Sequence, residues 1–187
     1  MTKPYKIIPM KNLIFISILL FLSCKSTKEM TLPAGFQHKF VLEKTTDKEV
    51  VITKTVEIQN GKQIELKKDG IGKYYIVTSD GNKVVFVIRV ARNLKEPLPD
   101  SAMEYSLTFE TDNPVKSFTK ENEALRDIKA VYGFHAFHPD SGYYPLDKGK
   151  ISLKTDKKNK KFIITVELPE KYGKMLNGTY EVPVPEN

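Results

Sequence analysis

The stretch of this sequence richest in chemically useful side chains runs over residues 132–145. It holds two of the chain's three histidines, His135 and His138, together with Asp140. Three such groups could hold a zinc ion, but side chains three apart on a strand point to opposite faces, so the two histidines would separate. The spacing therefore predicts no metal site, and nothing nearby predicts a cofactor.

The same stretch ends in a pair of neighbouring tyrosines. Exposed tyrosines offer a large amphipathic contact area at little entropic cost, so recognition surfaces use them often. The candidate residues for contact with a partner protein or a glycan are Tyr143, Tyr144, His138 and Asp140.

A purely structural interpretation of the stretch also stays open. Phe134 and Phe137 would then fill the core from opposite sides of a central strand. Residues 139–145 would form a long aromatic surface loop whose tyrosines pack only against that loop. The two interpretations differ in whether the tyrosines remain accessible to a partner.

Composition argues against two further classes of function. Of the 30 basic residues only Arg89, Arg92 and Arg126 are arginine, the residue best suited to reading bases and gripping phosphates, so we expect no nucleic-acid partner. No serine lies in a Gly-x-Ser-x-Gly context, and no glycine-rich phosphate loop is present. We therefore predict that the chain is not an enzyme.

The only cysteine, Cys24, follows an apolar run over residues 13–22. Lysines precede this run and acidic residues do not, which is typical of a secretory signal peptide. The run is too short for a membrane-spanning helix, which needs about 20 apolar residues. We predict that residues 1–23 are a cleaved signal peptide.

The sequence Phe-Leu-Ser-Cys at residues 21–24 resembles the lipobox of bacterial lipoproteins. In that family a small residue, here Ser23, precedes a cysteine that becomes acylated. The resemblance implies that Cys24 carries acyl chains and anchors the protein to a membrane. The residues after Cys24 lack the Asp that commonly retains such lipoproteins in the inner membrane, so the implied location is the outer membrane of a Gram-negative bacterium. Each buried methylene contributes about 0.8 kcal/mol, so several chains anchor firmly.

The rest of the chain alternates apolar and polar residues in the manner of half-buried strands. The segments expected to form strands are 36–43, 50–58, 63–67, 73–78, 83–90, 103–109, 128–137, 150–154, 161–168 and 179–184. Asn60-Gly61 and Asp80-Gly81-Asn82 match the tight turns of β-hairpins. Only residues 119–126 favour a short helix.

Nine or ten short strands with local hairpins predict an all-β fold, either an antiparallel β-sandwich or a barrel. We expect residues 24–33 to form a lipidated N-terminus and flexible stalk, and residues 34–187 to form a single β domain.

These features together predict a lipid-anchored envelope protein that acts as a non-catalytic interaction or structural module. Its partners would be the membrane, through the acyl chains on Cys24, and an envelope protein complex or a glycan. The alternative is a carrier of small apolar ligands with a lipocalin-like barrel.

Overall fold

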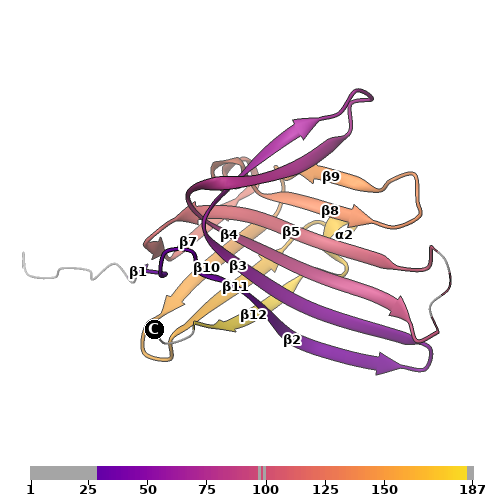
Figure 1. Cartoon of the computed structure of the whole chain (residues 1–187), viewed down its shortest axis with the longest axis horizontal. Helices are drawn as coiled ribbons and strands as arrows, with labels where there is room; N and C mark the ends of the chain where they lie inside the picture. Colours follow the sequence, from indigo (N-terminus) through magenta and orange to yellow (C-terminus); the bar gives the residue numbers. More distant parts are fainter. Residues whose placement is uncertain (1–28, 97, 99, 185–187) are drawn as a thin grey trace, which may run out of the picture.

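The computed structural model describes residues 29–96, 98 and 100–184, in which two main antiparallel β-sheets pack face to face (Figure 1). A third sheet has only two short strands, Glu29–Met30 and Val115–Lys116. The larger sheet contains β2 (Gln37–Asp47), β3 (Val50–Lys68), β4 (Tyr74–Leu94), β5 (Met103–Asp112), β8 (Val131–His135) and β9 (Gly142–Pro145), in that spatial order. The smaller sheet contains, in spatial order, β12 (Gly178–Pro183), β11 (Lys161–Glu167), β10 (Lys150–Asp156) and β7 (Phe118–Glu121). The predicted all-β class is confirmed.

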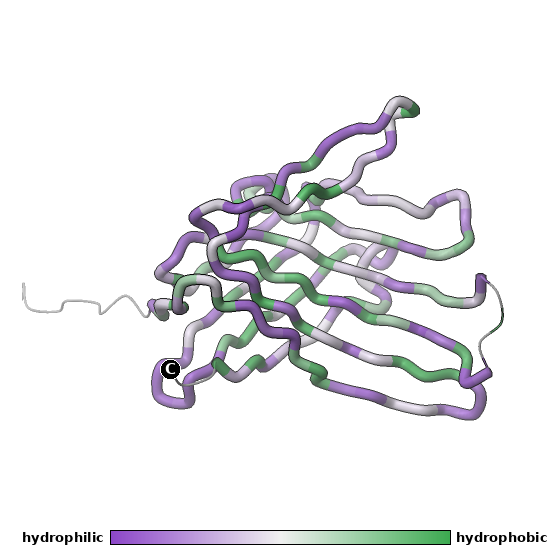
Figure 2. The backbone as a smooth tube through the Cα atoms, in the orientation of Figure 1, coloured by the Kyte–Doolittle hydropathy of each residue, from purple (hydrophilic) through white to green (hydrophobic). Residues whose placement is uncertain are grey.

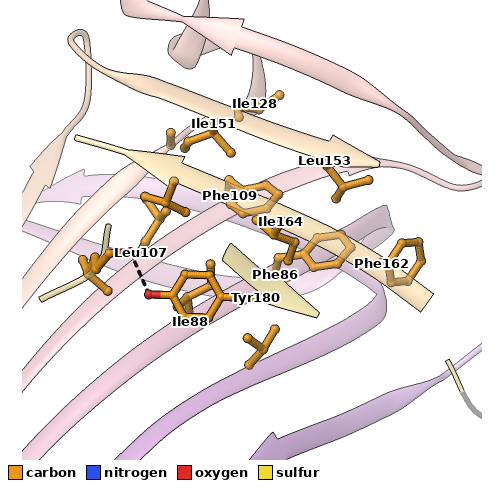
Figure 3. Close-up of a cluster of buried hydrophobic side chains, with 14 of the residues drawn as sticks. Phe86, Ile88, Leu107, Phe109, Ile128, Ile151, Leu153, Phe162, Ile164 and Tyr180 are labelled. Atoms are coloured by element: carbon orange, nitrogen blue, oxygen red, sulfur yellow. Dashed lines mark hydrogen bonds between the residues drawn. The ribbon is translucent and has the colours of Figure 1, made fainter. Parts of the chain in front are cut away.

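The interior between the two sheets is filled by aliphatic side chains and by aromatic rings from both sheets (Figure 3). Phe86 of β4 stacks on Phe109 of β5 with ring centroids 5.1 Å apart, and meets Phe162 of β11 edge-on at 5.5 Å. All three rings are fully buried. Figure 2 shows hydrophobic residues gathered in the middle of the strands and hydrophilic ones at many of the loops, as burial of apolar surface requires.

The two strands β3 and β4 are much longer than expected, with 19 and 21 residues. Asn60-Gly61 and Asp80-Gly81-Asn82 do not turn the chain, so the prediction of two hairpin turns was wrong. These segments face each other across the β3–β4 pair, where Lys62 pairs with both Asp80 and Lys83. The extra residues of β4 form a bulge that bends the ribbon, and the true turn lies at residues 69–73.

Beyond this bulge the ribbon continues as a hairpin arm, defined as residues 62–80 (Figure 1). Tyr74 of the arm pairs with Tyr143 of β9, which closes a ring of strands through β4, β5, β8 and β9. A small apolar cluster lies between the arm and the sheet, and its members are Ile64, Val85 and Val87, with Ile76 partly buried against them. The arm is therefore packed onto the sheet and is part of the fold.

The helices differ from the prediction in place and number. Residues 119–121 lie in β7, and the 3-10 helix η1 follows at Asn122–Ile128. A second helix, α2 (Glu170–Gly173), lies between β11 and β12 and was not expected. Across the described residues no helix combines the length and apolar character needed to span a bilayer.

Residues 29–33, expected to be part of a stalk, include paired and buried positions of the folded domain. Strand β1 (Glu29–Met30) pairs with β6 (Val115–Lys116), so these residues are not part of a free stalk. Leu32 is only 2% exposed, and its N–H donates to Asn113 Oδ1 at 3.1 Å. The expected boundary at residue 34 is therefore wrong because an apolar side chain in the supposed stalk belongs to the core.

Candidate functional site: an aromatic cleft

An aromatic cleft opens on the core-facing side of the larger sheet, over β5, β8 and β9. Its lining residues are Tyr105, Tyr132, Phe134, Asp140, Tyr144, Lys171 and Tyr172. Pairing of Tyr105 with Phe134, and of Tyr132 with Tyr144, sets these side chains in two neighbouring rows on one face of the sheet. The cleft is thus an extension of the surface that forms the core.

Helix α2 supplies the opposite wall of the cleft. Tyr172 lies with its ring centroid 4.9 Å from that of Tyr132 and 6.3 Å from that of Tyr144. Tyr105 and Phe134 stack on each other at 5.2 Å. The rings support one another at the spacings that aromatic pairs prefer, which fixes the shape of the cleft.

Two charged residues lie at the rim of the cleft. Asp140 comes from the β8–β9 loop, and Lys171 places its Nζ 5.3 Å from the centre of the Tyr172 ring. The cleft has a volume of about 360 Å³, toward the small end of the roughly 300–1,000 Å³ typical of ligand pockets. The cleft combines an aromatic surface with a negatively charged hydrogen-bond acceptor, Asp140, and a positively charged donor, Lys171.

The β8–β9 loop that carries Asp140 is held by its own hydrogen bonds. The Ser141 hydroxyl donates to the Ala136 carbonyl and accepts the Ala136 N–H, and the Ser141 N–H donates to the His138 carbonyl. From the hairpin arm, Lys73 Nζ donates to the carbonyls of Pro139 and Ser141 at 3.2 and 3.4 Å. A loop braced in this way presents Asp140 in one position and loses little entropy when a ligand binds.

The Tyr132 hydroxyl of the cleft stays neutral at ordinary pH. Burial, followed by the neighbouring tyrosines, raises the pKa of Tyr132 to about 12. The Tyr144 hydroxyl donates to the Asp140 carbonyl at 2.7 Å, which ties β9 to the loop. Tyr132 therefore brings a neutral hydroxyl and no negative charge to the cleft.

The structure brings together three of the four predicted contact residues. Tyr144 and Asp140 line the cleft, and His138 flanks it through an edge contact with Phe134 at 6.0 Å. The Asp140 N–H donates to His138 Nδ1 at 3.2 Å, so the imidazole also helps to hold the loop.

Tyr143 points to the other face of the sheet. Its ring lies against Gly133, where an added Cβ would approach the ring to 3.0 Å, and contacts His135 edge-on at 4.8 Å. Burial raises the pKa of Tyr143, with Arg89 opposing and Glu104 adding to the effect. Tyr143 is thus a packing residue of the outer face and not a member of the cleft.

The structural interpretation of the stretch is corrected in two ways. Strand β8 ends at His135, so Phe137 lies in the loop and is 83% exposed. Residues 142–145 form strand β9 and not a loop. Within the described residues no three side chains of His, Cys, Asp or Glu gather to hold a metal ion, and Cys24 lies outside those residues.

The sequence prediction missed five of the lining residues, which are Tyr105, Tyr132, Phe134, Lys171 and Tyr172. Side chains two apart on a strand share a face, so Tyr132 and Phe134 could have been placed together from the sequence. Assuming a hairpin over residues 132–144 would have added Tyr144 to the same face. No local signal marks Tyr172, since α2 is a four-residue helix. Comparisons with protein-family models, with curated proteins and with solved structures each gave no match to this chain.

Proposed function

We propose that this chain is a lipid-anchored envelope protein that acts as a non-catalytic binding module and receives its partner in the aromatic cleft. The observation that carries the proposal is the cleft, which combines four tyrosines and a phenylalanine with Asp140 and Lys171 on a rigid β framework. Recognition sites in proteins commonly have this composition, with rigid aromatic anchors and a few polar groups that fix orientation.

The position of the cleft supports a role away from the anchored end. The described chain starts at β1, at the left of Figure 1, whereas the β8–β9 loop lies at the right. Cys24 precedes Glu29 by only five positions in the sequence, so an acylated Cys24 would lie within about 18 Å of β1. The loop that carries Asp140 lies at the end of the domain opposite β1, the described strand nearest to Cys24 in the sequence (Figure 1).

The carrier of small apolar ligands has less support. Such a carrier needs an apolar cavity between its strands, and here Phe86, Phe109 and Phe162 occupy the space between the two sheets. A separate cleft of about 160 Å³ beneath the hairpin arm, lined by Ile64, Ile76 and neighbours, is small for such a ligand. We therefore retain the binding module as the proposed function.

The binding role can be tested with the full, detergent-solubilised chain incubated with envelope extract of the producing bacterium. A Tyr144→Ala/Tyr172→Ala variant should recover less of the bound envelope component than the unsubstituted chain. A Tyr75→Ala variant, which removes an exposed tyrosine on the hairpin arm, should recover the same amount. Equal recovery by all three proteins would overturn the proposal.

The anchor has its own test. Mass spectrometry of the intact purified protein should show a mature chain that starts at Cys24 and carries acyl groups. A Cys24→Ser variant should move from the membrane fraction to the soluble fraction, because the acyl chains supply the attachment. An unmodified Cys24 in a membrane-bound protein would contradict lipidation.

A further inference from the structure

The aromatic cleft selects for a ligand with one flat apolar face and a polar edge. Among its rings Tyr105, Tyr144 and Tyr172 are partly exposed, while Asp140 and Lys171 are exposed at its rim. We propose that the ligand is a neutral saccharide, bound with a sugar ring against the tyrosines; this inference rests on the proposed function. The C–H bonds on one face of a pyranose carry slight positive charge and pack well on the negative face of an aromatic ring.

The hydroxyl groups of a sugar match the polar groups of the cleft. The carboxylate of Asp140 accepts hydrogen bonds from neighbouring hydroxyls, and the ammonium of Lys171 donates to a hydroxyl or ring oxygen. Hydrogen bonds to charged groups are about twice as strong as those between neutral groups. A purely apolar ligand would displace water from Asp140 and Lys171 without making hydrogen bonds to either charge, which is unfavourable.

The charges of the cleft favour a neutral ligand. Five rings near a carboxylate could also form a cage for a quaternary ammonium group. Here, however, the Nζ of Lys171 already lies 5.3 Å from the Tyr172 ring centre and would repel a second cation. An anionic ligand would face the carboxylate of Asp140. Because the two charges balance, an uncharged ligand meets the smallest electrostatic cost.

The size and rigidity of the cleft fit a short saccharide segment. A volume of about 360 Å³ accommodates a small ligand, and both charged residues are exposed, so a longer glycan can continue into solvent. The Tyr144 hydroxyl and the braced β8–β9 loop fix the wall that a sugar ring would contact. A preformed site lowers the entropic cost of binding, which weak sugar contacts need.

Tyrosine fluorescence of the full, detergent-solubilised chain can test the inference. The chain has no tryptophan and nine tyrosines, of which Tyr105, Tyr132, Tyr144 and Tyr172 line the cleft, so part of its emission reports on the cleft. The probes are cellobiose, maltose and chitobiose as neutral disaccharides, with choline and glucuronic acid as charged comparisons. At least one neutral disaccharide should give a saturable change in emission, with a lower Kd than choline or glucuronic acid.

Substitutions then locate the binding. Asp140→Asn keeps the size of an exposed side chain and should weaken saccharide affinity by about tenfold. Tyr172→Ala should weaken it by a similar factor through loss of a stacking surface, and Tyr75→Ala should leave it unchanged. The melting temperature of each variant separates lost binding from lost folding. Saccharide binding that persists in both cleft variants would overturn the assignment.

The outcome also separates this inference from the proposed function. If no disaccharide binds, or if choline or glucuronic acid binds more tightly, the saccharide assignment fails. If the Tyr144→Ala/Tyr172→Ala variant nevertheless recovers less of the envelope component, the proposed binding function is supported and the ligand belongs to another chemical class. If a disaccharide binds and competes with the envelope component for the chain, both proposals are supported.

Discussion

Two aromatic clusters lie on the same face of the larger sheet and are covered in different ways. Phe86 and Phe109 are covered by the smaller sheet, whose Phe162 meets Phe86 edge-on, and all three rings are fully buried. Tyr105 and Phe134 lie further along the same face, where the short helix α2 is the nearest cover, and both remain partly exposed. The comparison shows that one continuous apolar surface forms the core at one end and lines the aromatic cleft at the other.

The two clusters also differ in residue type. The core cluster consists of phenylalanines, which have no polar atom to satisfy, whereas the cleft contains four tyrosines. A buried hydroxyl needs a partner, while a hydroxyl at the edge of a cleft can bond to water or to a ligand. The fully buried rings thus have no hydroxyl to satisfy, whereas Tyr105, Tyr144 and Tyr172 of the cleft are only partly buried.

The largest effect on stability should come from the core cluster. Phe86→Ala would remove a fully buried ring in contact with Phe109 and Phe162, at a cost of about 3–5 kcal/mol in the free energy of unfolding. Denaturant unfolding followed by circular dichroism measures this change. A loss below about 1 kcal/mol would mean that this region is no better packed than the cleft.

The next largest effect should be a loss of stability at alkaline pH. Burial raises the pKa of Tyr132 and of Tyr180 to about 12, whereas an unfolded tyrosine ionises near 10. The folded state binds these protons more tightly, so their contribution to stability is complete below about pH 10 and is lost as the pH rises toward about 12. Thermal unfolding at a series of pH values should show this decline.

A Tyr180→Phe variant provides the control for the pH effect. It keeps the ring and removes the ionisable hydroxyl, which donates to the Leu176 carbonyl at 2.7 Å (Figure 3). The alkaline decline should become shallower in this variant. An unchanged decline would assign the pH effect to other groups.

A smaller effect on stability is expected in the cleft itself. Tyr172→Ala should cost about 1–2 kcal/mol in the free energy of unfolding, because the ring is only partly buried against Tyr132 and Tyr144. The same denaturant unfolding measures it. A cost as large as that of Phe86→Ala would remove the distinction between core and cleft.

The smallest effect should be at Phe137, which is 83% exposed. Phe137→Ala should change the free energy of unfolding by less than about 0.5 kcal/mol, because the ring loses little buried surface. Unfolding curves of the two proteins should therefore overlap. A larger loss would show that the β8–β9 loop packs more tightly than its exposure indicates.

The alternating pattern of the sequence was sufficient to predict the all-β class, because alternation reports directly on which residues face a core. Most strand positions followed from it, including β5, β10 and β11. Tyr144 and Asp140 were found because they lie in one aromatic stretch. Tyr105 and Tyr172 were not predicted, because only the order of the strands and the placement of α2 bring these distant segments together.

The two turn signals failed for a related reason. Asn60-Gly61 and Asp80-Gly81-Asn82 have the composition of tight turns, and a bulge requires similar backbone freedom, as the φ of 78° at Gly61 shows. Whether such a segment reverses the chain or bends it depends on the strand beside it. Here each segment faces the other across the β3–β4 pair, which local composition does not reveal.

The hairpin arm also has a consequence for the order of folding. Its turn at residues 69–73 joins strands that are adjacent in the sequence, and the Asp69 carboxylate accepts the N–H groups of Ile71 and Lys73 there. Such local pairs form early, since little loop entropy is lost. We expect Asp69→Ala to slow refolding in stopped-flow experiments while leaving the unfolding rate nearly unchanged. Pairing that begins at this turn extends along β3 and β4 into the core, where a slip of one residue would turn Phe86 out to solvent.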